Sequence, residues 1–261
     1  MSTPKTTPTL FIKSILFYIL FAIVTVLYTL PCVVLAPFLS LKNKHAVIAV
    51  WGKMFLWLIE RICGVKYEVS GLDKVSNKPA VVMSKHQSDW ETFAFLTLFN
   101  PQSTVAKKEL LTIPFFGWCL KIKDPVIIDR SKKTNALKQL ISQGKENLKK
   151  GCWVMIFPEG TRVAPGEPSE YSSGGAFLAQ KAGVSIIPIA HNAGEFCPPR
   201  GYIKYPGTIQ VVVGPEISTE GKKAKAIMKE VESWIRSTMA EISPENEGLE
   251  NKAPASSEER A

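Results

Sequence analysis

A histidine with two carboxylates close behind it is the most reactive combination in this 261-residue chain. His86 is followed by Asp89 and Glu91. Histidine is the side chain whose ordinary pKa suits proton transfer near neutral pH. A neighbouring carboxylate can hold the tautomer of the ring and stabilise the imidazolium ion that forms. The spacing therefore predicts a general base with an acidic partner.

The same residues also fit a purely structural role. Ser88 and Glu91 have the spacing of a capping box, in which Ser88 caps the start of a helix and Glu91 bonds back to it. A helix is expected from about residue 89 to residue 99. The local pattern alone does not separate capping from catalysis for Glu91, so the rest of the chain has to decide.

More polar side chains follow apolar runs that are typical of strands. Lys107 follows residues 103–106, Arg130 follows residues 125–128, and the segment Glu159-Gly160-Thr161-Arg162 follows residues 152–157. Arginine presents a planar fork suited to phosphate, lysine a point charge, and glycine lets the backbone approach a ligand closely. A solvated surface charge is the commoner explanation for any one of these cations. Their shared position at strand ends instead predicts one crevice that holds a base, carboxylates and cations.

The elements that would position these residues alternate between strand and helix, which predicts an α/β sheet with helices on both faces. Strands are expected at residues 65–69, 79–84, 103–106, 125–128, 152–157, 184–190, 202–205 and 208–213. Helices are expected at residues 89–99, 134–150, 174–182 and 219–241. We place the globular domain at residues 64–242. Residues 243–261 carry five glutamates against one lysine and one arginine, and are expected to be a disordered acidic tail.

Residues 1–63 are predicted to anchor the chain in a membrane. No charged residue occurs between Ser14 and Leu41, a run longer than the roughly 20 apolar residues that span a bilayer as a helix. Pro31 and Pro37 are expected to kink or end that helix. A cleaved signal peptide fits less well because the run is long and has no clear cleavage site. Residues 46–63 predict a second apolar helix at the membrane interface, with packing into the globular core as the alternative.

Composition excludes several classes of protein. The net charge of +9 favours an anionic partner, but the basic residues are scattered and the aromatic residues gather in the apolar N-terminus, which disfavours nucleic acid. The five cysteines are dispersed without a CxxC pair, which argues against a disulfide framework and against a zinc site. Of the other two histidines, His45 is expected to face lipid headgroups, and His191 to make a local hydrogen bond at a strand end.

Four ordered motifs resemble those of the glycerolipid acyltransferase family, with the bacterial 1-acyl-sn-glycerol-3-phosphate acyltransferases as its nearest members. The resemblance covers residues 65–215 and rests most firmly on the hexapeptide Phe157-Pro158-Glu159-Gly160-Thr161-Arg162. The other segments that carry the resemblance are His86-Gln87-Ser88 with the acid that follows, Lys107-Lys108-Glu109-Leu110 with residues 113–117, Ile128-Asp129-Arg130, and Ile186-Ile187-Pro188-Ile189. One departure stands out. The family pattern is His, four residues, then Asp, whereas position 91 is Glu, and Asp89 is an additional acid inside the motif.

The resemblance implies a mixed sheet flanked by helices and direct acyl transfer. His86 is the expected base and Glu91 its partner, because Glu91 has the family's spacing, although Asp89 can also take that role. Lys107 and Arg162 are expected to hold a substrate phosphate, with Arg130 as a weaker candidate. Glu159, Gly160 and Thr161 are expected to shape that site. No metal or resident cofactor is expected, and acyl-CoA or acyl carrier protein serves as co-substrate.

The resemblance also implies an acceptor and a location. The expected acceptor is lysophosphatidate, converted to phosphatidic acid in the bilayer, with the catalytic domain on the cytoplasmic side of a bacterial inner membrane. The residues 110–120 are expected to supply part of an apolar groove for the acyl chain, or else a plain core segment. Two alternatives stay open: a different lysolipid acceptor, such as a lyso-ornithine lipid or lysophosphatidylglycerol, and a non-catalytic lipid-binding protein of the same fold.

Overall fold

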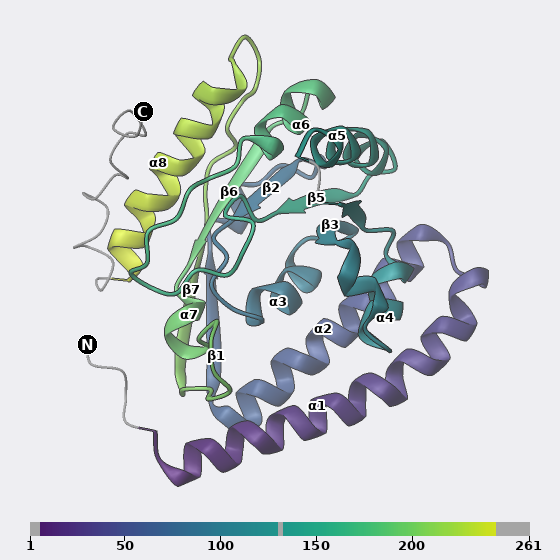
Figure 1. Cartoon of the computed structure of the whole chain (residues 1–261), viewed down its shortest axis with the longest axis vertical. Helices are drawn as coiled ribbons and strands as arrows, with labels where there is room; N and C mark the ends of the chain where they lie inside the picture. Colours follow the sequence, from purple (N-terminus) through teal and green to yellow (C-terminus); the bar gives the residue numbers. More distant parts are fainter. Residues whose placement is uncertain (1–5, 130–132, 244–261) are drawn as a thin grey trace.

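In the computed structural model, which describes residues 6–129 and 133–243, a seven-stranded sheet lies between layers of helices (Figure 1). The strand order across the sheet is β1-β7-β6-β2-β5-β3-β4. The strands are β1 (Val65–Ser70), β2 (Val81–Ser84), β3 (Gln102–Lys107), β4 (Val126–Ile128), β5 (Trp153–Ile156), β6 (Ile186–His191) and β7 (Gly207–Val213).

Strand direction decides which residues meet at one edge of the sheet. Strands β6, β2, β5, β3 and β4 run parallel, whereas β7 is antiparallel to β6 and parallel to β1. The prediction of a mixed sheet flanked by helices is therefore confirmed. Because β2, β3, β4 and β5 all end at the same edge, the residues that follow them are brought to one side of the molecule.

Helices cover both faces of the sheet, as the alternation of elements predicts. They are α3 (Trp90–Leu98), α4 (Phe116–Ile122), α5 (Lys133–Lys149), α6 (Gly174–Ala182), α7 (Ala193–Phe196) and α8 (Ala224–Ile242). Successive residues of the buried strand β2 point to opposite faces. Val82 joins a hydrophobic cluster with α2 (Leu41–Cys63), α3 and α4, whereas Val81 and Met83 join a second cluster with α5, α6 and α8.

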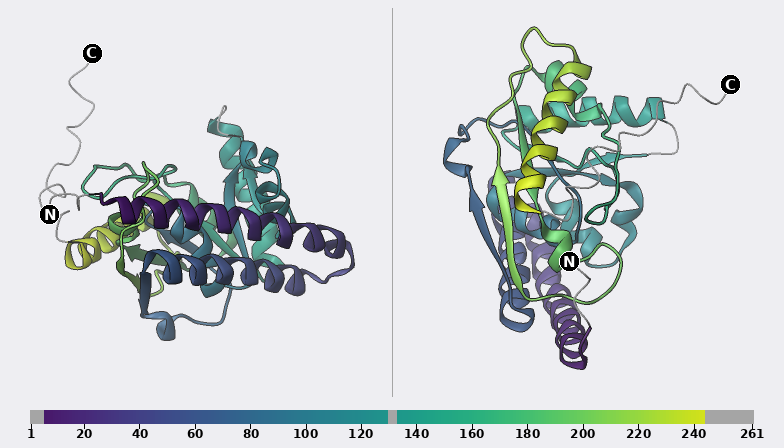
Figure 2. Two further views of the ribbon diagram at one scale, coloured as in Figure 1. Left: turned by 90° about the horizontal axis from the view of Figure 1, so that it is seen from below. Right: turned by 90° about the vertical axis from the view of Figure 1, so that its left-hand side faces the viewer.

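The N-terminal helix α1 (Pro8–Leu35) and α2 pack side by side as a helical hairpin beneath the sheet (Figure 2). One side of α1 is buried: Phe17 is fully buried and packs edge-on against Phe55 of α2. The other side is apolar and exposed, with Ile12, Ile19, Ile23, Leu27, Leu30 and Val34 among its residues. Within the described residues, the segment Pro8–Phe38 is the one helix long and apolar enough to cross a membrane. The helix continues through Pro31, where we expected a kink or an end.

The expected pair of membrane helices is not confirmed, because α2 is largely buried in the globular core. Trp51, Phe55 and Ile59 are buried against α1 and α3, while Trp57 is exposed. The Trp51 indole N–H donates to Thr25 Oγ1 at 3.1 Å instead of meeting a lipid interface. Packing into the core, the alternative for residues 46–63, describes α2 better. The domain boundary at residue 63 stays a prediction.

Three local predictions are wrong for identifiable reasons. Residues 202–205 form no strand, because the Lys204 N–H donates to Ser14 Oγ of α1. Helix α8 begins at Ala224, after a turn at residues 220–221, not at residue 219. His45 does not face lipid headgroups: it is 4 % exposed, and its Nδ1 accepts the N–H of Gln102 at 3.3 Å. Arg130 and residues 244–261 lie outside the described residues, so their roles are untested.

Candidate active site

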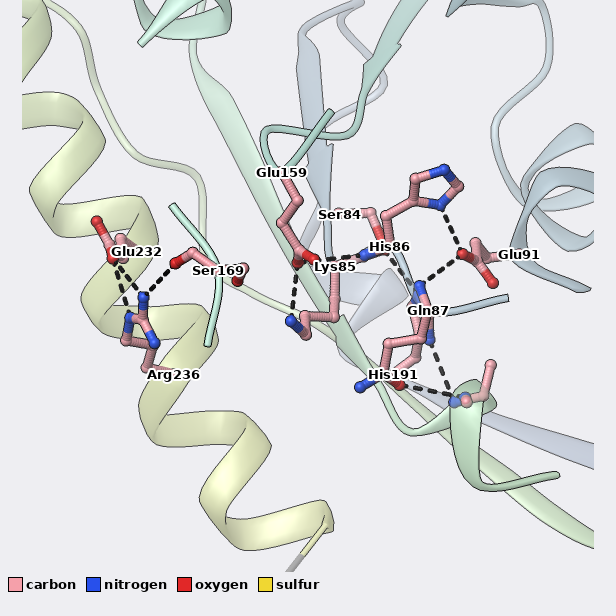
Figure 3. Close-up of polar contacts among 12 residues, drawn as sticks. Ser84, Lys85, His86, Gln87, Glu91, Glu159, Ser169, His191, Glu232 and Arg236 are labelled. Carbon is pink, nitrogen blue, oxygen red and sulfur yellow. Dashed lines mark hydrogen bonds and ion pairs between the residues drawn. The ribbon is translucent and has the colours of Figure 1, made fainter. Parts of the chain in front are cut away.

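His86 and Glu91 are in direct contact. His86 follows strand β2, and Glu91 lies in the first turn of helix α3. Nδ1 of His86 is 2.8 Å from Oε1 of Glu91, and the same oxygen accepts the backbone N–H groups of Gln87 at 2.9 Å and Ser88 at 2.8 Å (Figure 3). Glu91 is fully buried. Three donors on one oxygen hold the carboxylate in a single position beside the imidazole.

The contacts of Glu91 are compatible with both explanations weighed for it, capping and support of His86. The bond from the Ser88 N–H to Glu91 is the reach-back half of a capping box, and the Trp90 N–H donates to Ser88 Oγ at 3.0 Å. The helix starts one residue later than the motif predicts, with Asp89 as N-cap. The carboxylate that closes the start of α3 is therefore the carboxylate that holds His86.

Asp89, the other possible partner of His86, points elsewhere. Its Oδ1 is 2.7 Å from Nζ of Lys204, which is 1 % exposed, and it also accepts the Ser88 hydroxyl at 3.2 Å. Lys204 lies at the end of the loop that follows α7, and its backbone N–H is bound to α1. This ion pair leaves Glu91 as the acid on the histidine ring.

The surroundings keep Glu91 ionised. Burial would raise the pKa of this carboxyl, but the hydrogen bonds from His86 and from the Ser88 backbone oppose it, and the pKa lies below its ordinary value. An ionised acceptor beside Nδ1 assigns the ring proton to Nδ1 and leaves Nε2 as the proton acceptor. The ring is stacked on Phe157, with centroids 4.0 Å apart, which fixes its plane. The side chain of His86 stays 15 % exposed.

Glu159 supports His86 from behind. Its Oε1 is 2.9 Å from Nζ of Lys85 and accepts the backbone N–H of His86 at 3.4 Å (Figure 3). Burial raises the pKa of the Glu159 carboxyl, and the Lys85 ammonium opposes that effect. Glu159 was expected to shape the substrate site. Its Oε1 is occupied by Lys85 and by the histidine backbone, so the contacts of this oxygen position His86.

His191 fixes the same turn from the neighbouring strand β6. It is fully buried, its Nε2 donates to the carbonyl of Lys85 at 2.9 Å, and its Nδ1 accepts the N–H of Ala193 at 3.3 Å. Burial lowers the pKa of His191, in keeping with a neutral ring that donates from one nitrogen and accepts at the other. The expected local hydrogen bond at a strand end is confirmed.

His86 opens onto a cavity of about 1160 Å³ that also reaches the predicted phosphate-binding residues. Lys107 at the end of β3 and Gly160, Thr161 and Arg162 after β5 line it together with His86 and Glu159. Gly160 has a φ of 71°, a left-handed conformation that favours glycine. The structure thus brings together every described member of the predicted site.

The cavity continues from this polar mouth between the sheet and helices α2, α3 and α4. The walls of this part, here called the apolar arm, are formed by Ile48, Trp51, Phe93, Leu96, Phe116, Cys119 and Leu120. Three of these residues come from the segment 110–120 that was expected to line a groove. The side chains that line the arm are hydrocarbon, aromatic or thiol groups.

Sequence reasoning missed two buried lysines of this site. Lys85 is adjacent to His86, and its position at a strand end was the available signal. Lys204 is more than a hundred residues away, in a segment that we expected to be a strand, and no local pattern indicates its bond to Asp89. Only the folded chain places it there.

Several known proteins resemble this chain in sequence. The acyltransferase family model matches residues 66–192. A 1-acyl-sn-glycerol-3-phosphate acyltransferase of Pseudomonas aeruginosa is 45 % identical over 94 % of this chain and 96 % of its own length. The Escherichia coli protein of the same name is 32 % identical over 66 % of this chain and 71 % of its own length.

The fold also has a counterpart among solved structures. The crystal structure of the 1-acyl-sn-glycerophosphate acyltransferase PlsC from Thermotoga maritima superposes with a TM-score of 0.70, at 22 % sequence identity, covering 88 % of this chain and 98 % of that one. At this identity the likeness concerns the fold alone.

Proposed function

This chain belongs to the acyltransferase family, and we propose that it transfers an acyl chain to the sn-2 hydroxyl of 1-acyl-sn-glycerol-3-phosphate, giving phosphatidic acid. The donor in this proposal is acyl-CoA or acyl carrier protein. The names of the relatives support the acceptor. One observation carries the proposal: a histidine held by an ionised carboxylate opens onto the same cavity as Lys107 and Arg162.

The proposed chemistry is a direct transfer. Nε2 of His86 removes the proton of the lipid hydroxyl while its oxygen attacks the carbonyl carbon of the thioester. The carbon–sulfur bond then breaks, and the proton held by His86 passes to the departing thiolate. The Glu91 carboxylate stabilises the imidazolium ion between these two steps, as it is already ionised and only 2.8 Å away. Each proton removed is returned, so no other reactant is needed.

The cations of the cavity serve the acceptor in this proposal. Arg162 and Lys107 bind the phosphate of lysophosphatidate, and Arg130 assists them. Charge-assisted bonds of this kind are stronger than neutral ones, particularly where arginine offers two donors. The apolar arm takes the acyl chain of the donor. Lys85 and Glu159 act through the backbone of His86 without touching substrate.

The exposed apolar side of α1 supports a location at a membrane. We place that surface on the cytoplasmic leaflet of a bacterial inner membrane, where an acceptor lipid is available in the bilayer and the donor arrives from the aqueous side. Exposed apolar residues of α4, which packs against α1, and of the segment before it extend the surface, among them Leu110, Ile113 and Trp118. A basic protein at an anionic leaflet also attracts phosphate-headed lipids.

The test is a transfer assay with the purified full-length chain in phospholipid vesicles. Radiolabelled acyl-CoA or acyl carrier protein is offered with lysophosphatidate, lysophosphatidylglycerol or a lyso-ornithine lipid. We expect labelled phosphatidate to form with the highest kcat/KM. A preference for another lysolipid would reassign the acceptor, and no transfer with any acceptor would make the chain a lipid-binding protein.

A further inference from the structure

The far end of the apolar arm is polar. Lys123, which follows α4, lines the cavity there together with Thr104 of β3. The Lys123 side chain is 2 % exposed, and its Nζ lies 2.6 Å from Gln102 Oε1 and 2.7 Å from Thr104 Oγ1. Lys123 and Thr104 line the cavity and Gln102 supports the Lys123 amine; these three side chains are here called the end wall.

The end wall differs from an ordinary buried ion pair because it has no acid. Among the described residues, no carboxylate lies within 4.0 Å of Lys123 Nζ, and the adjacent Asp124 is paired with Lys150 on the surface. Burial accordingly lowers the pKa of Lys123 to about 7. The Lys123 amine is therefore held by two neutral acceptors.

The strand register gives the depth of the end wall. Thr104 pairs with Met155 of β5, and Met155 pairs with Val82 of β2, four residues before His86. At roughly 3.3 Å per residue along a strand and 4.8 Å between strands, Thr104 lies about 13 Å below His86 and about 10 Å to one side. His86 and Thr104 share the sheet face that α2, α3 and α4 cover. An extended chain of about a dozen carbon–carbon bonds spans that distance.

We propose that Lys123, supported by Gln102 and Thr104, is the specificity-determining residue that limits the length of the acyl chain. This inference rests on the proposed function, because it takes the arm as the site of the acyl chain. An acyl chain whose terminal methyl group stops before the end wall contacts only apolar side chains. A longer chain must displace the amine from its two acceptors, which leaves buried polar groups without partners, a costly state.

The experiment compares chain-length profiles of the full-length chain in vesicles. The value of kcat/KM is measured for saturated acyl thioesters from 10 to 20 carbons with lysophosphatidate as acceptor. In the native protein, we expect a steep fall beyond the length that reaches Lys123. Lys123→Ala opens the end wall and should raise the ratio of kcat/KM for the longest chain to that for the shortest by about tenfold, as expected for two buried methylenes.

Two further variants separate polarity from space. Lys123→Met keeps a long side chain without the amine, and Thr104→Val removes one acceptor at nearly constant volume. Both variants should improve kcat/KM for the longest acyl chains, but by less than Lys123→Ala does. Lys121→Ala is the matched control, since Lys121 is an exposed lysine in the last turn of α4, two residues before Lys123; its profile should equal that of the native protein. Thermal unfolding in detergent confirms that each variant is folded.

A second readout does not depend on turnover. Calorimetry with non-reactive acyl-CoA thioethers gives the Kd for each chain length in the native protein and in the variants. An unchanged length dependence in folded Lys123→Ala and Thr104→Val would overturn this inference while leaving the proposed function in place. The native chain could transfer no acyl group while Lys123→Ala still changes how Kd depends on acyl-chain length. That result would refute the proposed function and support the limit on chain length set by Lys123.

Discussion

A histidine and a buried lysine lie near each end of the cavity, in opposite electrostatic surroundings. At the mouth, His86 is bound to Glu91, and the buried Lys204 nearby is bound to Asp89. At the far end, Lys123 is bound to Gln102 and Thr104, and His45 accepts the Gln102 N–H. Each end therefore has a histidine and a buried lysine, but only the mouth has carboxylates for them.

That difference decides which groups carry charge. Burial lowers the pKa of Lys204, but its neighbours Cys197, Asp89 and Tyr18 outweigh that effect and raise the pKa above its ordinary value. Burial lowers the pKa of Lys123 to about 7 and that of His45 to about 4, and no carboxylate is close enough to reverse it. A buried base stays ionised where an acid is adjacent and tends toward neutrality elsewhere. The mouth is thus suited to proton transfer, and the far end to a neutral ligand.

The largest expected effect comes from removing one histidine at each end. His86→Ala should lower kcat/KM for acyl transfer by about 10³-fold, within the range for loss of a general base. His45→Ala should change kcat/KM by less than about threefold per folded molecule. Transfer assays and sedimentation with vesicles test both, and membrane association should be retained because the exposed side of α1 is untouched. Near-native turnover by His86→Ala would show that His86 is not the general base.

The second effect compares the two acids of the motif. Glu91→Gln removes the charge that stabilises the imidazolium ion, so kcat should fall by about 10²-fold. Asp89→Asn breaks only the pair with Lys204 and should lower the melting temperature with little change in kcat. Glu91→Asp, the residue of the family pattern, should recover part of the activity. If Asp89→Asn proved the more damaging to kcat, the geometry of Figure 3 would be the wrong guide to the active pair.

The third effect concerns the cations at the mouth. Arg162→Ala should raise KM for lysophosphatidate by about 10- to 100-fold, the size expected for a lost charge-assisted hydrogen bond, with a smaller change in kcat. Arg162→Lys keeps the charge and should lie between. Lys150→Ala is the control, since Lys150 is an exposed lysine paired with Asp124 away from the cavity. Equal KM values for Arg162→Ala and the native chain would exclude Arg162 from phosphate binding.

The smallest effect is a pH dependence of stability at the far end. The pKa of His45 is about 4 in the fold and 6.5 in a model peptide, so the unfolded chain binds a proton that the fold excludes between these values. Stability is therefore complete above about pH 6.5 and falls as the pH drops toward 4. The loss for His45 amounts to at most about 3 kcal/mol. Denaturant unfolding should show a shallower fall for His45→Gln; identical slopes would contradict a buried neutral ring.

Most of the fold was predictable because its signals are local. Runs of four to six apolar residues before His86 and Glu159 predict the buried strands there. Gly183 marks the end of α6. The family resemblance added the roles of the site residues. Predictions were wrong where the position of a side chain depends on contacts with residues far away in the sequence. Trp51 and His45 look like interface residues in the sequence, but α1, α3 and β3 cover them in the fold.

The active pair shows the same limit. The residues themselves did not distinguish Asp89 from Glu91, which follow His86 by three and five residues, and only the family's spacing favoured Glu91. The choice depends on Lys204, whose contact with Asp89 spans 115 residues. The end wall was equally hidden, because Lys123 follows a helix as an ordinary surface lysine would, and only strand pairing brings Gln102 and Thr104 to it.

The bonds between α1 and the rest of the chain have a practical consequence. Ser14 accepts the Lys204 N–H, Thr25 accepts the Trp51 indole N–H, and Thr29 contacts Cys119 of the cavity wall. Trimming the first forty residues to obtain a water-soluble enzyme would thus strip three polar contacts and uncover the aromatic layer around Phe55. Purification strategies that keep the whole N-terminus in detergent or nanodiscs preserve what the truncated protein would lose.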